Sequence, residues 1–382
     1  MAKPKKISIG VIGAGGRAHL INNIKGVGKD VELRAVYDPD KDRAKSLCDA
    51  FGVGEREICK SYEDVANCPD LDWVMIFSPN CHHKEHIVAA FGAGKNVFSE
   101  KPLATTIDDC KAIHKAHEKS GVLFATGFVL RYSPLYRKIR QLLDEGYIGK
   151  ILSIDANENV TPAHGSYIMK NWRRFTKISG PHILEKCCHD LDLLNWFVGT
   201  VPSKVASFGG CDLFIPENKN LPKKFKKGEG KTAFKGWHDP HGVNCPFSSE
   251  KDIIDNQVAI MEYRNNVRVM FQATLSNAIP ERRMYISGTE GNIVAELYTN
   301  TLRAKRLDSD YVQSYDSCGG DMHGGGDRII MEELYDCMKK NTAPKCGGEE
   351  GLRGSVTALG IDQARVEGRV VDLEPVWRKL GV

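Results

Sequence analysis

An apolar run that ends in a glycine-rich turn opens this chain and restricts its fold more than any other segment. Residues 7–18 read Ile-Ser-Ile-Gly-Val-Ile-Gly-Ala-Gly-Gly-Arg-Ala. The spacing G-x-G-x-x-A is the fingerprint of a strand–turn–helix unit that binds a dinucleotide. Gly13 permits the sharp turn, Gly15 lets a pyrophosphate approach the backbone, and Ala18 lets the next helix pack closely on the strand. The unpaired N–H groups at the start of that helix favour a diphosphate.

The end of the second predicted strand indicates which dinucleotide binds. Strand 31–37 ends at Asp38, about 20 residues past the glycines, where an acid binds the ribose hydroxyls. A carboxylate there repels a 2′-phosphate, so the sequence favours NAD, and the nearby Arg43 keeps NADP as the less favoured alternative. Asp38 is also a candidate N-cap for the helix that begins near residue 40, and one carboxylate can serve both purposes.

Predicted strands and helices alternate up to about residue 127, which is typical of a doubly wound parallel sheet. The apolar strands are short, as expected of a sheet that is covered on both faces. The predicted strands are 7–12, 31–37, 72–77, 96–99 and 122–126, and the predicted helices lie near 17–28, 40–51, 61–67, 83–92 and 106–119. We therefore predict a Rossmann dinucleotide-binding domain over residues 1–127.

The pattern changes in the remainder, 128–382, which we predict to be a second domain for substrate binding and oligomerisation. Strands in direct succession imply an open, mainly antiparallel sheet and an α+β class. The C-terminal helix is free to pack back on the first domain. Predicted helices lie near 133–145, 188–198, 326–340 and 349–366, and predicted strands at 150–158, 203–214, 256–263, 266–275, 282–288 and 291–298. The polar segment 215–255 is predicted to be a long loop or insertion.

Composition excludes several classes of protein. A net charge of +4 on 382 residues is too small for a nucleic-acid grip that depends on dense positive charge. The 12 cysteines do not form the spaced framework of a small secreted scaffold, so we expect reduced thiols and a cytoplasmic protein. We identify neither a signal-peptide core before the first strand nor an apolar run long enough to span a membrane.

Residues at the ends of the middle strands carry chemistry. Lys101, in the run Glu100-Lys101-Pro102, is placed to stabilise an alkoxide or to pass a proton, although a surface lysine before a proline has the same pattern. The run Ser78-Pro79-Asn80 precedes three histidines at 82, 83 and 86, at the edge where the nicotinamide half of a cofactor is expected. No acid or cysteine stands at ligand spacing from these histidines, so we predict no metal there.

His189 is the candidate proton donor or acceptor of the second domain. Glu185 lies four residues before it and Asp192 three after it, and a carboxylate near an imidazole orients the ring and raises its pKa. An amphipathic helix that merely fills the core explains the neighbouring leucines equally well but does not require the histidine.

These motifs, in this order, resemble the Gfo/Idh/MocA family of glucose–fructose oxidoreductases and inositol dehydrogenases. The resemblance covers most of the chain outside 215–255. It implies an NAD(P)-dependent enzyme that transfers hydride between nicotinamide and a sugar, sugar derivative or cyclitol, with Lys101 as a catalytic residue and His189 as the proton donor or acceptor. It also implies a homodimer or homotetramer formed through the open sheet face. Members usually carry Asp where this chain has Glu185, and the adjacent Lys186 is a second cation that could favour an acidic or a differently placed sugar.

The resulting site predictions fall into three groups. The catalytic group is Lys101, His189 and Glu185. The cofactor group is Gly13, Gly15, Gly16, Arg17, Ala18, Asp38, Arg43, Ser78, Pro79, Asn80, His83, Glu100 and Lys101, and no resident metal is expected. The substrate group is Arg131, Tyr132, Asn159, His164, Trp172, Arg173, Lys186, His189 and His323, with Asn157, Glu158, Tyr167 and Arg174 as further pocket candidates.

Four alternatives are weighed at this point. Some members of the family resemble glycosidases that oxidise a sugar transiently, eliminate the aglycone and reduce the sugar again. A non-enzymatic NAD-sensing regulator is disfavoured because Lys101 and His189 are both present. The lysines between 219 and 235 fit a solvated loop better than an anionic partner or a lid, and a zinc site at 237–245 has unusual ligand spacing.

Overall fold

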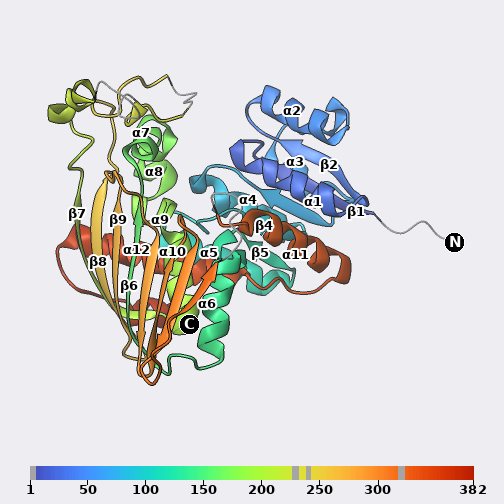
Figure 1. Ribbon diagram of the computed structural model, residues 1–382. Coiled ribbons are helices and arrows are strands. Elements are labelled where there is room, and N and C mark those ends of the chain that lie inside the picture. The colour runs from blue at the N-terminus through green and yellow to red at the C-terminus, as the bar shows by residue number, and fades with distance from the viewer. Residues whose placement is uncertain (1–5, 226–231, 238–241, 317–322) are drawn as a thin grey trace. The chain divides into compact units, whose positions relative to one another are not determined.

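A computed structural model of the chain describes residues 6–225, 232–237, 242–316 and 323–382 (Figure 1). Contacts divide it into two units. The first comprises Met1–Tyr132 and Gly325–Ser355, and the second Ser133–Gly324 and Val356–Val382. The sequence prediction placed one boundary after residue 127, whereas this division returns the chain to the first unit at residue 325.

The first unit has the predicted Rossmann architecture. Its sheet has the order β2-β1-β3-β4-β5, and every pair of neighbouring strands is parallel. The strands are β1 (Ile7–Ile12), β2 (Val31–Tyr37), β3 (Trp73–Ile76), β4 (Asn96–Ser99) and β5 (Phe124–Thr126). The helices are η1 (Gly16–Leu20), α1 (Ile21–Val27), α2 (Lys41–Phe51), η2 (Glu55–Glu57), α3 (Tyr62–Ala66), η3 (Asn80–His82), α4 (His83–Gly92), α5 (Ile107–Ser120), η4 (Val129–Tyr132) and α11 (Gly326–Lys340), while α12 (Gly348–Glu367) runs on into the second unit.

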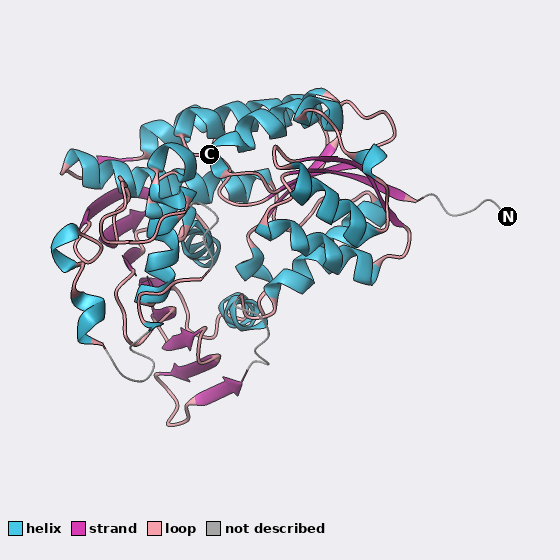
Figure 2. Cartoon of the chain, turned by 90° about the horizontal axis from the view of Figure 1, so that it is seen from above, coloured by secondary structure: helices cyan, strands magenta, loops and turns pink. Residues whose placement is uncertain are grey.

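The second unit is built on a mixed sheet of nine strands in the order β13-β12-β11-β10-β6-β9-β8-β7-β14 (Figures 1 and 2). All neighbours are antiparallel except β6 and β9, so the predicted α+β class is confirmed. The strands are β6 (Ile151–Asn159), β7 (Pro202–Gly210), β8 (Asn256–Tyr263), β9 (Arg268–Thr274), β10 (Arg283–Gly288), β11 (Gly291–Glu296), β12 (Thr301–Arg306), β13 (Gln313–Asp316) and β14 (Val371–Asp372). The helices are α6 (Pro134–Asp144), α7 (Pro162–Lys170), η5 (Trp172–Arg174), α8 (Thr176–Ser179), α9 (His182–Glu185), α10 (Cys188–Val198), η6 (Pro216–Asn218), η7 (Leu221–Lys224) and α13 (Glu374–Leu380).

The two faces of this sheet differ in burial. Along β8 and β9 buried and exposed residues alternate, because successive side chains of a strand point to opposite faces. Phe208, Ile260 and Met270 on the open face are 73%, 59% and 55% exposed. Large apolar side chains therefore remain uncovered on one face.

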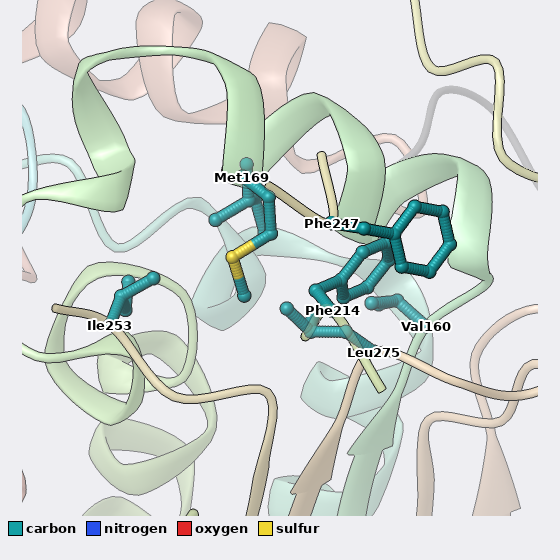
Figure 3. Packing of buried hydrophobic residues seen from close by; sticks show 7 residues of the cluster. Val160, Met169, Phe214, Phe247, Ile253 and Leu275 are labelled. Atoms are coloured by element: carbon teal, nitrogen blue, oxygen red, sulfur yellow. The ribbon is translucent and has the colours of Figure 1, made fainter. Parts of the chain in front are cut away.

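Part of the segment predicted to be a loop is a packed element. Phe214, Phe247 and Ile253 are buried against Met169 of α7 and Leu275 (Figure 3). The predicted strand 203–214 ends earlier, at Gly210, and the chain beyond it turns into this cluster. The sequence did not reveal this cluster, because the apolar residues of the segment are not spaced with the period of a helix or a strand.

The lysines of the same segment divide into two sets. Those at 219, 223, 224 and 235 are exposed, and those at 226, 227 and 231 lie outside the described residues. Three residues of the zinc candidate, His238, Asp239 and His241, also lie outside them. Among the residues that are described, no group of three or more His, Cys, Asp and Glu side chains could hold a metal. None of the described helices is long and apolar enough to cross a bilayer.

Candidate active site

The glycine-rich turn after β1 leaves space where a pyrophosphate would approach. Gly13 has φ +90°, and a Cβ on it would lie 2.5 Å from the Ser78 backbone nitrogen, so only glycine fits. A Cβ on Gly15 or Gly16 would meet no atom within 4 Å. The loop is thus closed on the side of β3 and open on the other, which fits a bound diphosphate. The first turn beyond the loop is the 3₁₀ helix η1, which contains the buried Ala18, rather than an α-helix.

Asp38 lies beside this loop. Its Oδ2 accepts a hydrogen bond from Ala14 N–H at 2.7 Å, and its Oδ1 accepts one from Asp40 N–H at 2.9 Å. The alternative role of Asp38 as a helix cap is wrong, because the N-cap of α2 is Asp40, which accepts from Asp42 N–H and Arg43 N–H. The Arg43 side chain is exposed and pairs with Asp40 at 3.1 Å. The side chain that contacts the glycine-rich loop is therefore the Asp38 carboxylate, while Arg43 is paired with Asp40.

Glu100 and Lys101 follow β4 and are anchored by Arg17. The Arg17 Nε donates to Glu100 Oε1 at 2.7 Å, and its Nη2 lies 2.9 Å from Asp327 Oδ1. The second oxygen of Glu100 accepts from the Lys101 backbone N–H at 3.2 Å. Arg17 thus has a positioning role, and its direct contact with a cofactor stays a prediction. Asp327 lies in the first turn of α11, whose N-cap is Gly325.

The segment after β3 is fixed by two histidines. His83 is fully buried, and its ring nitrogens lie 2.7 Å from the Pro102 carbonyl oxygen and 2.9 Å from that of Ser78. Burial lowers the pKa of His83 below its ordinary value. The Ser78 hydroxyl lies 2.9 Å from Nδ1 of His86, and burial lowers the pKa of His86 to about 3. The ring nitrogens of His83 thus face two backbone carbonyls and link the segments that follow β3 and β4, and its contact with a cofactor stays a prediction.

Pro79 and Asn80 continue this segment. Pro79 precedes η3, and Asn80, its first residue, is buried. The predicted contact of these two residues with a cofactor stays a prediction.

In the second unit, His189 is in the first turn of α10 and is almost fully buried. Its ring lies 5.6 Å from the ring of His323, centre to centre, at an angle of 53°. Two of the three histidines that the sequence assigned to the substrate group are therefore neighbours, although 134 positions separate them in the chain.

Glu185, the last residue of α9, forms a buried ion pair. Its Oε1 accepts from the Arg173 Nε at 2.7 Å, and Arg173 Nη1 donates to the Tyr167 hydroxyl oxygen at 3.1 Å. The guanidinium also lies over the Trp172 ring, 4.3 Å from its centre. Four of the predicted pocket residues are thus connected by direct contacts. The orientation of His189 by Glu185 remains a prediction.

Lys186 belongs to a charged network that runs into the core. Its Nζ lies 3.2 Å from Glu158 Oε1, and Arg282 lies 2.7 Å from both Glu158 Oε2 and Asp190 Oδ2. The Tyr298 hydroxyl also donates to Glu158 at 3.2 Å. Burial opposes the charge of Glu158, but Arg282 and Lys186 outweigh it and hold the pKa of Glu158 below its ordinary value. The network fixes the Lys186 ammonium from the side of the core.

His164 of α7 faces the same charges. Burial lowers its pKa to about 2, and the nearby Lys186 acts in the same direction. The imidazole is therefore neutral at physiological pH, and His164 contributes hydrogen-bonding atoms rather than charge to this part of the unit.

Two predicted substrate residues are placed differently from the expectation. Tyr132 is buried and its hydroxyl donates to Glu333 at 3.0 Å, so it is a structural residue of the first unit. Asn159 lies on the open face of the sheet, where its amide contacts Gln272 and Thr274. Glu158 points to the opposite face, because consecutive residues of a strand alternate.

Arg131 is placed close to Glu350, with 3.8 Å between its Nη1 and the carboxylate oxygen. The two side chains therefore form a long ion pair, and the substrate role of Arg131 stays a prediction. Sequence reasoning missed Arg282 and Tyr298. Neither belongs to a motif. The register of β10 against β6 brings Arg282 to Glu158, and the pairing of β11 with β10 brings Tyr298 there.

Comparisons with known proteins identify the family. The chain matches the family model "Oxidoreductase family, NAD-binding Rossmann fold" over residues 7–128 and "Oxidoreductase family, C-terminal alpha/beta domain" over residues 140–373. These matches cover most of the sequence. The chain belongs to the Gfo/Idh/MocA oxidoreductase family, as its motifs predicted.

The individual relatives and solved structures described next share between 19% and 36% of aligned residues with this chain. Inositol 2-dehydrogenase 3 of Saccharopolyspora erythraea is 36% identical over 198 residues, which is 50% of this chain and 54% of that protein. The 2,7-anhydro-N-acetylneuraminate hydratase of Mediterraneibacter gnavus is 26% identical over 296 residues, 77% of this chain and 68% of that protein. Levoglucosan dehydrogenase in complex with NADH and levoglucosan superposes with a TM-score of 0.78 at 19% identity, over 97% of this chain and 100% of that one, which shows the shared fold.

Proposed function

We propose that the protein is an NAD-dependent dehydrogenase that oxidises a secondary hydroxyl of a sugar, sugar derivative or cyclitol. The observation that carries the proposal is the placement of two features in the first unit. The open glycine loop follows β1 and the anchored Glu100-Lys101 pair follows β4, and these two strands lie on either side of β3 in one parallel sheet. Ligands of such sheets bind at the carboxyl ends of the strands. The inositol dehydrogenase relative supports a polyol as substrate.

The reaction divides between cofactor and protein. Oxidation removes a hydride from carbon and a proton from oxygen, and a bound nicotinamide ring supplies the hydride acceptor. We assign Lys101 to stabilise the developing alkoxide and His189 to take the hydroxyl proton. Lys186 and Arg173 are assigned to sugar oxygens, since both are held by buried carboxylates.

NAD rather than NADP is part of this proposal. The Asp38 carboxylate next to the loop disfavours a 2′-phosphate, and Arg43, the nearest candidate to bind one, is engaged by Asp40. The free thiols of the described residues suit the reducing cytoplasm, where we place the enzyme.

A second candidate is cofactor-recycling cleavage or hydration of a glycosidic or anhydro bond. The 2,7-anhydro-N-acetylneuraminate hydratase relative favours it, because the hydration in that protein's name involves no net redox change. In this reading NADH formed in one half of the cycle is consumed in the other.

One assay separates the two candidates. Purified protein is mixed with NAD or NADP and with sugars, uronic acids, cyclitols and nitrophenyl glycosides, and absorbance is followed at 340 nm for NADH and at 405 nm for nitrophenolate. We expect NADH to accumulate with at least one sugar or cyclitol, and faster than NADPH. Nitrophenolate release without NADH would replace the dehydrogenase by the recycling reaction.

We further propose a homodimer or homotetramer formed through the open sheet face. Exposed Phe208, Ile260 and Met270 form an apolar surface that a second copy would cover. We expect Ile260→Lys, combined with Met270→Lys, to convert the oligomer to a monomer in light-scattering measurements, because two charges per copy would be buried. A wild-type protein that is already monomeric at micromolar concentration would contradict this assignment.

A further inference from the structure

One tryptophan of the second unit is exposed although it is held in place. All five tryptophans lie in the described residues, and only Trp237 is exposed, at 47%. Its indole stacks on the Tyr167 ring, 4.5 Å between centres and 27° between planes. The His164 ring packs against the indole in an edge-on arrangement, with 4.9 Å between the ring centres and 69° between the planes. The free part of the indole is therefore a flat apolar surface in a fixed orientation.

The backbone before Trp237 fixes that orientation. Gly236 has φ +62°, and a Cβ on it would lie 3.0 Å from the Tyr167 backbone nitrogen. The Lys170 ammonium donates to the Lys235 carbonyl at 3.2 Å. Only glycine allows the chain to approach α7 this closely, so the segment 235–237 is docked on the helix rather than resting loosely on it.

This aromatic pair connects directly to the proposed substrate residues. The Tyr167 hydroxyl accepts from Arg173, and Arg173 binds Glu185, which lies four residues before His189. The Arg173 guanidinium also lies 5.6 Å from the centre of the Tyr167 ring. Trp237 is thus three contacts away from Glu185, through Tyr167 and Arg173, and lies farther along this chain of contacts than Arg173, which is assigned to the oxidised sugar.

We propose that Trp237 is a stacking platform for a second ring attached to the oxidised sugar. The substrate class is then a glycoside, with an aglycone or a second sugar residue over the indole, rather than a free monosaccharide. The apolar face of a sugar or an aromatic aglycone covers an indole well, and covering a half-exposed tryptophan is favourable. The inference deepens the proposed function and rests on it for the identity of the first ring.

Binding measurements without turnover test this inference. Ligand-observed NMR gives dissociation constants for methyl and p-nitrophenyl β-glycosides of glucose, galactose and glucuronic acid, in which only the second group differs. The variants are Trp237→Ala, Trp237→Tyr and Phe225→Ala. Phe225 is the matched control, because it lies in the same segment, is 45% exposed and packs on Phe234 rather than on Tyr167.

We expect wild type to prefer the nitrophenyl glycoside of at least one sugar, and Trp237→Ala to reduce that preference about tenfold. Trp237→Tyr should restore most of it, and Phe225→Ala should leave it unchanged. Equal weakening of both glycosides in Trp237→Ala, or no preference in wild type, would overturn the inference. Because no hydride transfer is measured, an absent dehydrogenase activity would leave this result standing.

Discussion

Replacement of Lys101 by Met is expected to lower kcat by about 10²- to 10⁴-fold and to leave the affinity for NAD within a few-fold of wild type. The methionine keeps most of the side-chain volume but cannot stabilise an alkoxide or pass a proton. The anchor of this segment, the Arg17–Glu100 ion pair, does not involve the Lys101 side chain. Steady-state kinetics with the best substrate and NAD titration by fluorescence measure the two quantities separately.

The control for this prediction is Lys115→Met, an exposed lysine of α5 in the same unit. It removes the same charge from the Rossmann unit without touching the end of a strand. A Lys101→Met protein that binds NAD and retains the activity of the Lys115→Met protein would refute the catalytic role of Lys101.

Arg282→Met is expected to destabilise the second unit by about 3–5 kcal/mol, because it leaves two buried carboxylates without their shared cation. Glu158 and Asp190 are fully buried, and both lie 2.7 Å from the guanidinium. Glu158 would keep only Lys186 as a charged partner among these groups. Urea unfolding followed by circular dichroism should show a lower midpoint for the transition of the second unit.

Arg264→Met provides the comparison, because it removes a half-exposed ion pair with Glu374 from the same unit. Such surface pairs contribute about 1 kcal/mol or less. If Arg282→Met is no less stable than Arg264→Met, the claim that Arg282 stabilises the second unit by compensating two buried carboxylates is wrong.

The first unit was predictable because its signals are local. Short apolar strands, caps and the glycine spacing each occupy a few neighbouring residues, and the strands found lie within two residues of the predicted ones.

In the second unit, helix α7 and strands β12 and β13 were among the elements that the sequence analysis missed. Helix α7 begins at Pro162 and contains Gly165, whose absent Cβ makes room for Phe214, so its sequence lacks the pattern of an ordinary amphipathic helix.

The sequence identified candidate site residues that belong to short motifs, but not those that are brought together by the register of the strands. Glu185, Lys186 and His189 come from one short run and were found together. Asn159 and Glu158 are adjacent in sequence, yet the strand points their side chains to opposite faces of the sheet. Only the pairing of β6 with β9 and β10 shows which of the two side chains lies on the covered face. Arg282 reaches the network through the same register, which a single sequence does not reveal.

A double-mutant cycle tests the central claim that Lys101 and His189 serve one reaction. The rate of hydride transfer is measured at 340 nm in single turnovers for wild type, Lys101→Met, His189→Asn and the double variant. If both residues act on the same hydroxyl, the double variant should be about as slow as the slower single variant, because groups that act as a unit are strongly non-additive. Losses that simply multiply, or a His189→Asn protein with wild-type rate, would contradict the account.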